Sequence, residues 1–334
     1  MTNIKKIGLS ALAGALAMTS AHAGALSVTG NMEISYTKGS NETTSNPLGQ
    51  ANDITLTGST ELDNGVTVSY KNTSSDTTLT GDSELAFGNI LGGTLAMTSA
   101  GAPISGIDNK TPTAFKDAEG MVGSITDVNG GDGTYGIRYT LADVGGSGVK
   151  LDYMYFPVHG TGDATGDEGF SGGGHGNLDA HDITLTGAFP GVEGLNLGVG
   201  YYRANYDIKS FPDDTKDEGT AYATYAYGPI TVGYQRGVTS GAGKGSNWYK
   251  NEYMGISYAI SDDLSVSYNT TESQKGGGAV ASNWNPAASK YDSFSLSYSM
   301  GGMTINIADA DCTNCSYTAA KSQDERTISM SVAF

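Results

Sequence analysis

The strongest constraint in this sequence is a period-two alternation of apolar and polar side chains along most of its length. In the first run the apolar positions, broken only by Gly30, are Leu26, Val28, Met32, Ile34 and Tyr36. Side chains alternate across a strand, so each such run predicts a strand with one apolar face and one polar face. Nearly every predicted strand has this character, and little sequence remains for a covering layer. We therefore expect the apolar faces to lie in lipid, around a closed barrel with a polar lumen.

Repetition of the pattern predicts an all-β fold, a transmembrane antiparallel β-barrel of about sixteen strands. The last strand is expected over Arg326–Phe334. The tenth, Thr220–Tyr227, is the least regular, because Tyr222 and Tyr225 fall on opposite faces. Short turns alternate with links that are mostly long and polar, and residues 100–133 form the longest of these. That asymmetry is typical of bacterial outer-membrane barrels, and an even strand count places both termini on the periplasmic side.

Residues 1–23 have the features of a secretory signal peptide. Two lysines precede an apolar run, Ile7–Met18, and Ala21-His22-Ala23 supplies small residues at the two positions that signal peptidase recognises. The apolar run is too short for a membrane-spanning helix. We therefore expect export through the periplasm, cleavage after Ala23, and a single barrel domain over residues 24–334.

The chain is strongly acidic, with a formal net charge of −17. Nucleic-acid binding requires a basic face, so no nucleic-acid partner is expected. Acidic charge suits a surface that faces small cations, or divalent ions that bridge anionic lipid. Glycine is abundant, with 49 residues, yet the period-two runs of Tyr, Val, Ile and Thr favour sheet over disorder.

The two cysteines, Cys312 and Cys315, lie in the polar segment Asp309–Asp324. In an exported chain the expected state is a small structural disulfide. A zinc site would need a second pair of ligands, and a thioredoxin-like centre would need a strand–helix context. The sequence shows neither. A loop this short gains little chain-entropy stabilisation from the bond.

The whole predicted barrel resembles the general porins of Gram-negative bacteria. The shared features are a signal peptide, a start directly on a strand, a long segment between the fifth and sixth strands, and the aromatic ending Met330-Ser331-Val332-Ala333-Phe334. The resemblance implies a sixteen-stranded outer-membrane barrel that forms homotrimers among outer-membrane lipid and lipopolysaccharide. It also implies that residues 100–133 fold into the lumen as a constriction loop, and that the barrel-assembly machinery reads Phe334.

The charged residues expected at the constriction are mostly acidic. Those of the loop are Asp108, Lys110, Lys116, Asp117, Glu119 and Asp127. Those of the early strands are Glu33, Asp53, Glu61, Lys71, Asp82 and Glu84, and the nearest basic candidates are Lys71, Arg138 and Lys150. General porins oppose the acidic loop with an arginine cluster on early strands, whereas the first arginine here is Arg138. A mostly acidic eyelet would attract cations and repel anions, while carboxylates at the barrel mouths would only aid solubility.

Other polar clusters carry weaker predictions. His159, His175 and His181 could suggest a metal site, but their wide spacing on a glycine-rich segment favours solvated side chains. The acidic pieces Asp163–Glu168 and Asp213–Glu218 offer oxygen ligands without the twelve-residue calcium-loop pattern. Solvated loop charge is expected there, with loop-bound calcium or lipopolysaccharide-bridging cations as the alternative. No other cofactor is expected, and no nucleophile elbow is found on a strand-to-helix turn.

These features predict a passive, water-filled channel for small hydrophilic solutes and ions in the outer membrane, with cation preference and no catalytic step. One alternative is a substrate-selective channel for sugars or organic cations. That channel would need an aromatic track along the lumen, whereas the predicted inward faces are mostly Ser, Thr, Gly and Asn. A second alternative is an outer-membrane enzyme or adhesin with a closed barrel.

Overall fold

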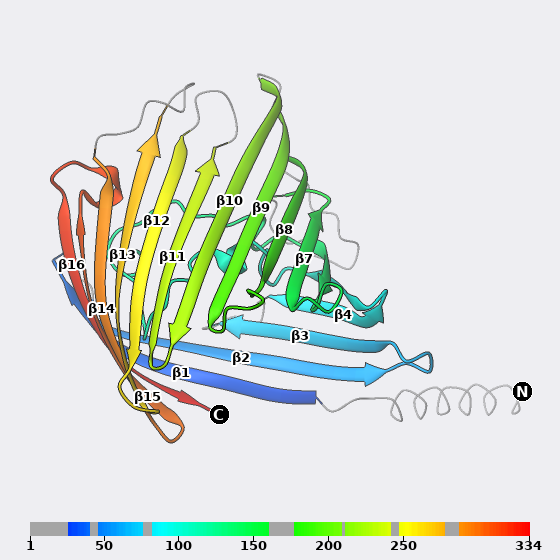
Figure 1. Ribbon diagram of the computed structural model, residues 1–334, viewed down its shortest axis with the longest axis horizontal. Coiled ribbons are helices and arrows are strands. Elements are labelled where there is room, and N and C mark those ends of the chain that lie inside the picture. The colour runs from blue at the N-terminus through cyan, green and yellow to red at the C-terminus, as the bar shows by residue number, and fades with distance from the viewer. Residues whose placement is uncertain are drawn as a thin grey trace, which may run out of the picture.

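Sixteen antiparallel strands form a closed barrel in the computed structural model (Figure 1). The structure describes residues 26–40, 46–75, 82–159, 177–208, 211–241, 247–277 and 287–334. Each strand pairs with its neighbours in sequence, and β1 pairs with β16 to close the sheet. The predicted fold class is therefore confirmed. Among the described residues, no helix has the length and apolar character needed to cross a membrane.

The elements follow one another along the chain without crossovers. Their bounds are β1 Leu26–Gly39, β2 Leu48–Glu61, β3 Thr67–Ser75, β4 Ser83–Ile90, β5 Gly93–Thr98, η1 Ser105–Ile107, β6 Gly136–Leu141, β7 Val149–Phe156, β8 Asn177–Ala188, β9 Leu195–Ile208, β10 Phe211–Tyr227, β11 Ile230–Ser240, β12 Trp248–Ala259, β13 Leu264–Gly276, β14 Ser289–Met300, β15 Met303–Thr313, η2 Cys315–Tyr317 and β16 Ser322–Ala333.

Alternate side chains of each strand point to opposite sides of the barrel wall, as the sequence pattern predicts. Tyr36 on β1 lies opposite Ile328 on β16, and Ile328 lies opposite Ile307 on β15, so apolar side chains meet on the outer face. These side chains are widely exposed in the isolated chain, 62% for Val28 and 58% for Met97. Soluble monomers rarely expose apolar surface of this extent, so the outer face requires an apolar surrounding such as lipid.

The seam between β1 and β16 extends to the last residue of the chain. The Gly30 N–H donates to the Phe334 carbonyl oxygen at 2.8 Å, and the Phe334 N–H donates to the Gly30 carbonyl oxygen at 2.9 Å. A Cβ atom built on Gly30 would lie 2.9 Å from the Phe334 ring and 2.9 Å from the Asp53 carbonyl oxygen. The break in the first apolar series is thus the place where the terminal ring lies against the wall.

The tenth strand begins earlier than the sequence predicts. β10 starts at Phe211 rather than Thr220, so Asp213–Glu218 is strand and not loop. Its link to β9 is only residues 209–210, which lie outside the described residues. The acidic segment reads as a loop in the sequence, but its charges are matched in the sheet. On the outer face, Arg203 Nε of β9 lies 2.7 Å from Asp217 Oδ1, the kind of cross-strand pair that stabilises a sheet.

Several expectations fall outside the described residues and stay predictions. They concern the signal peptide 1–23 with cleavage after Ala23, His175, and the acidic piece Asp163–Glu168.

The irregular pattern of the tenth strand is explained by its pairing. Tyr222 lies opposite the buried Gln235 of β11 and Tyr225 lies opposite the outward Val232, so the two rings do face opposite sides.

We predict that Gly30→Ala lowers the free energy of unfolding of the barrel by about 1–3 kcal/mol, because the new Cβ overlaps the Phe334 ring and the backbone of β2. The measurement is urea unfolding in detergent micelles. Gly58→Ala is the matched control, since its nearest contact would be Leu26 at 3.8 Å, and it should change the stability by no more than about 0.5 kcal/mol. Equal effects of the two variants would contradict the role given to Gly30.

Candidate functional site

The segment between β5 and β6, residues 99–135, lies inside the ring of strands, and we call it the inner loop (Figure 1). The Ile104 N–H donates to both carboxylate oxygens of Asp182 on β8, at 3.1 and 3.2 Å. The Gly130 N–H donates to Glu218 Oε2 on β10 at 2.6 Å. Both carboxylates are buried and have inward parity. The two ends of the inner loop are therefore bound to the wall by carboxylates that accept backbone N–H groups.

Gln235 on β11 fixes the stretch that follows η1. Its Oε1 accepts the Lys110 N–H at 2.7 Å, and its Nε2 donates to the carbonyl oxygens of Ile107 and Asp108, each at 2.7 Å. Gln235 has no exposed surface. One buried amide thus satisfies three backbone groups of the inner loop, which an irregular segment cannot pair within itself.

Small polar side chains of β12–β14 hold the second half of the inner loop. Asn251 Nδ2 on β12 donates to the Thr126 carbonyl oxygen at 2.9 Å. Ser267 Oγ on β13 accepts the Ala114 N–H at 2.8 Å. The inward Ser and Asn residues, which the sequence predicts to face the lumen, thus form a polar seat for the inner loop along one side of the wall. The inner loop also packs against Phe156 of β7 and Cys312 of β15.

Four carboxylates of the inner loop form one electrostatically coupled group, namely Asp108, Asp117, Glu119 and Asp127. Asn109 Nδ2 donates to Asp117 Oδ2 at 3.0 Å and to Glu119 Oε1 at 2.6 Å. Burial, reinforced by the Asp117 charge, raises the pKa of Glu119 to about 7. Burial also raises the pKa of Asp127 to about 7. All four residues keep part of their surface exposed, so their charge acts on the lumen.

The predicted basic residues of β6 and β7, Arg138 and Lys150, are neutralised by a neighbouring carboxylate. Arg138 Nε and Nη2 donate to the two oxygens of Asp152 on β7 at 2.9 and 2.8 Å. Lys150 Nζ lies 2.5 Å from Asp152 Oδ2. On the inner loop, Lys110 is exposed and Lys116 Nζ lies 5.3 Å from the centre of its neighbouring Phe115 ring. Arg138 and Lys150 are thus held by a carboxylate instead of opposing the loop as a cluster of unpaired cations.

The early strands add mostly acidic groups to the inward face. Register places Glu33, Asp53, Glu61, Lys71 and Glu84 on that face, with Lys71 directly opposite Glu84. Asp82 immediately precedes β4, and its carbonyl oxygen accepts the Thr73 N–H at 2.9 Å. This wall therefore faces the inner loop with carboxylates and a single lysine among the described residues of β1–β4.

Three acidic residues of the site are not among the residues predicted from the sequence: Asp152, Asp182 and Glu218. The face on which these residues lie can be inferred from the alternation. Asp152, for example, stands between the outward Leu151 and Tyr153 and must therefore point inward. The loop partners of Asp182 and Glu218 could not be inferred, because β8 and β10 are far from the inner loop in sequence.

The predicted disulfide forms, and the histidines considered as metal ligands lie apart from one another. Cys312 and Cys315 form a disulfide with a Cα–Cα distance of 5.5 Å. His159 is buried, so the expectation that it is solvated is wrong: its Nε2 lies 3.0 Å from the Asn205 carbonyl oxygen of β9. His181 lies on the outer face of β8. Within the described ranges, no group of three or more His, Cys, Asp or Glu residues is arranged to hold a metal ion.

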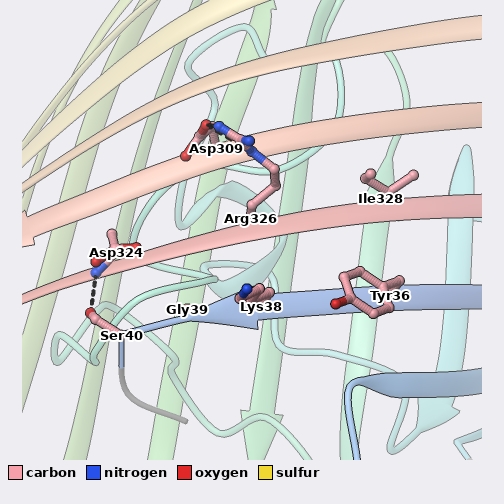
Figure 2. Close-up of a pocket in the computed structure, with 8 residues that line it drawn as sticks. All are labelled: Tyr36, Lys38, Gly39, Ser40, Asp309, Asp324, Arg326 and Ile328. Atoms are coloured by element: carbon pink, nitrogen blue, oxygen red, sulfur yellow. Dashed lines mark hydrogen bonds and ion pairs between the residues drawn. The ribbon is translucent and has the colours of Figure 1, made fainter.

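A pocket of about 640 Å³ opens on the outer face of the barrel, across β1, β15 and β16 (Figure 2). It contains Lys38, Arg326, Asp309 and Asp324, and Arg326 is ion-paired with Asp309. No ion pair among the described residues involves Lys38. An apolar groove of about 600 Å³ shares Tyr36 and Ile328 with this pocket and continues along the same face. The pocket is therefore separate from the lumen site.

Comparison with known proteins identifies the fold. No protein-family model matches the chain. None of the curated proteins matches it in sequence. OmpF of Salmonella typhi, solved in complex with daunomycin, is 12% identical, with a TM-score of 0.62 over 93% of this chain and 98% of that chain. An anion-selective porin from Comamonas acidovorans is 12% identical, with a TM-score of 0.64 over 93% and 100% of the two chains.

The trimer form of OmpT, an outer-membrane protein of Vibrio cholerae, is 8% identical, with a TM-score of 0.64 over 93% and 100% of the two chains. At these identities the likeness shows the fold. The chain has the sixteen-stranded barrel fold of Gram-negative porins, as the sequence resemblance implied.

We predict that Gln235→Ala releases the first half of the inner loop while the barrel stays folded. Three backbone groups lose their partner, each at a local cost of about 1–3 kcal/mol if left unpaired. Hydrogen–deuterium exchange of residues 104–112, followed by mass spectrometry in micelles, should become faster. Asn306→Ala is the control, because its amide contacts Ser329 of β16 and not the inner loop. Unchanged exchange in Gln235→Ala would show that Gln235 is not an anchor.

Proposed function

We propose that this chain is an outer-membrane porin, a water-filled channel for passive diffusion of small hydrophilic solutes and ions, with preference for cations and no catalytic step. The observation that carries the proposal is the inner loop itself. It is bound across one side of a closed barrel and presents a coupled group of carboxylates to the lumen. A loop held in this way narrows a sixteen-stranded barrel, which otherwise leaves a wide aqueous channel.

The preference for cations is argued from this chain's own residues. The fold cannot supply it, because the Comamonas porin of the same fold is described as anion-selective. Here the inward bases Arg138 and Lys150 are paired with Asp152, and Lys216 lies 2.5 Å from Glu218. In the part of the chain that the structure describes, no ion pair involves Asp108, Asp117, Glu119 or Asp127, and Lys110 is the one cation that acts on Asp108. The remaining field at the narrowest part is therefore negative, which concentrates cations there and excludes anions.

Planar-bilayer recording tests the proposal directly. A diffusion channel should give large, ohmic current steps, with a reversal potential in a salt gradient that has the sign of cation permeation. Saturation or block by one sugar or organic cation would favour a substrate-selective channel instead. Absence of any conductance from correctly folded protein would refute the channel.

Assembly in the outer membrane is part of the proposal. A homotrimer is supported by the trimer form of the similar Vibrio cholerae protein, and export by the predicted signal peptide. Phe334 presents an exposed aromatic ring at the end of β16, which suits recognition by the barrel-assembly machinery. The outer face requires lipid contact along its whole apolar band.

Lipopolysaccharide is the proposed lipid partner at the outer pocket. The pocket contains Ser40, directly after β1, and Asp324, near the start of β16. It therefore lies toward the end of the barrel that carries most of the longer links, which in outer-membrane barrels is the outside. Lys38 and Arg326 supply cationic groups for phosphate, and the apolar groove below them suits an acyl chain. Asp309 and Asp324 would face bridging divalent cations. The pocket thus offers both kinds of contact that a phosphorylated lipid requires.

The raised pKa values predict that cation preference depends on pH near neutrality. Glu119 and Asp127 titrate near 7, so they are mostly negative above that pH and mostly neutral below it. The cation-to-anion permeability ratio from reversal potentials should fall roughly twofold or more as the pH is lowered from about 8.5 to about 5.5.

The matched variants decide which groups cause the change. Glu119→Gln combined with Asp127→Asn should give a lower ratio that no longer varies over this range. Glu252→Gln removes a carboxylate from the outer face of β12 and should leave the titration intact. A wild-type ratio that stays constant down to about pH 5, where ordinary carboxylates begin to titrate, would contradict the assignment.

We also predict that Lys38→Ala reduces the lipopolysaccharide that remains bound after purification, measured as lipid phosphate per barrel, by roughly half or more. Lys71→Ala makes the same charge change on the lumen face and serves as the control. Loss of lipid phosphate in both variants would point to net charge rather than to the outer pocket.

A further inference from the structure

The link between β15 and β16 has an unusual backbone. Residues Asn314, Ser316, Tyr317 and Ala320 have φ values of 54°, 53°, 60° and 61°, in the left-handed region that L residues other than Asn seldom adopt. Such conformations persist only where the surrounding contacts over-determine them. We call Cys312–Tyr317 the disulfide turn, after the bond that it contains.

The disulfide turn packs against the inner loop. Cys312 and Cys315 are buried in one cluster with Tyr291 of β14 and with Ala118 and Val122 of the inner loop. The Tyr291 hydroxyl donates to the Ser124 carbonyl oxygen at 3.3 Å. The disulfide and one aromatic ring therefore form a wall on which residues 118–124 rest.

The fit is closest at Gly123, which has a φ of +76°. A Cβ atom added there would lie 3.3 Å from the Tyr291 ring and 3.6 Å from Cys315 Cβ. The inner loop approaches the disulfide turn as closely as a residue without a side chain allows.

Tyr317 provides the polar half of the contact. Its hydroxyl oxygen accepts the Thr126 N–H at 3.4 Å and lies 2.7 Å from Ser273 Oγ of β13. Its own N–H donates to Ser289 Oγ of β14 at 2.7 Å. Tyr317 is thus fixed to two strands and reaches from them to the backbone of the inner loop.

The disulfide has little to contribute to global stability, because its cysteines are only three residues apart and the loop-closure entropy is small. Its effect must be local. We propose that the disulfide turn is a positioning element for the constriction: it fixes residues 118–126 and thereby sets where Glu119 and Asp127 lie in the channel. This inference rests on the proposed channel function and identifies Cys312, Cys315 and Tyr317 as residues that determine its conductance and selectivity.

The first test compares wild type with the double variant C312S/C315S. Hydrogen–deuterium exchange of residues 118–126 should become faster by about tenfold or more, while exchange of the barrel strands stays unchanged. Exchange that stays at the wild-type rate in folded protein would overturn the proposal. So would an equal acceleration throughout the barrel, because it would show a global rather than a positioning effect.

The second test reads the channel. C312S/C315S should change single-channel conductance, increase current fluctuations, and shift the pH at which cation preference is lost, because Glu119 and Asp127 leave their present surroundings. Wild-type conductance, fluctuations and titration in the double variant would overturn the proposal. If wild type itself forms no channel, the proposed function fails, whereas the exchange experiment still decides whether the disulfide turn positions the loop.

Tyr317→Phe separates the hydroxyl from the disulfide. It removes the acceptor for the Thr126 N–H and keeps the ring, so exchange near residue 126 should accelerate without loss of the bond between Cys312 and Cys315. Tyr258→Phe makes the same change on the outer face and should have no effect on the inner loop. Identical exchange in wild type and Tyr317→Phe would remove Tyr317 from the proposal.

Discussion

The structure depends on the requirement that every backbone N–H and C=O at membrane depth finds a partner within the sheet. Lipid offers no hydrogen bonds, so an open strand edge there would cost several kcal/mol for each unpaired group. Pairing of β1 with β16 removes the last edge, and the bonds between Gly30 and Phe334 continue that pairing to the end of the chain. Closure also determines which face is wet: once apolar side chains point to lipid, alternation leaves the polar ones around a lumen.

Most of the fold is readable from the sequence because closure and alternation act on each residue locally. A strand in lipid must have apolar side chains at every second position. This pattern is clear over Leu26–Tyr36 and again in the last strand of the chain. The prediction fails at the start of β10, where acidic residues suggest a loop. There Asp217 is stabilised by Arg203 on a neighbouring strand, and no local pattern in β10 reveals that partner.

The site is less predictable than the wall for the same reason. The sequence places the carboxylates on the inner loop, and this location agrees with the structure. It does not indicate that Gln235, more than a hundred residues later, provides three bonds to the loop. An inward Gln, Ser or Asn looks the same in sequence whether it contacts water or backbone. The contacts of the inner loop depend on the course of its backbone through the lumen. The period-two alternation of the strands carries no information about that course.

Carboxylates have two roles in the lumen, holding the inner loop and attracting cations, and the degree of burial of each carboxylate decides which role it has. Asp182 and Glu218 are almost completely buried. Both oxygens of Asp182 and Oε2 of Glu218 accept backbone N–H groups of the loop, and Oε1 of Glu218 lies 2.5 Å from Lys216 Nζ. Glu119 and Asp127 keep part of their surface exposed. Only the second kind can lower the energy of a passing cation, because an ion must reach the charge to interact with it at close range. The number of acidic residues facing inward therefore overstates the field at the constriction, which depends on those that the loop leaves uncovered.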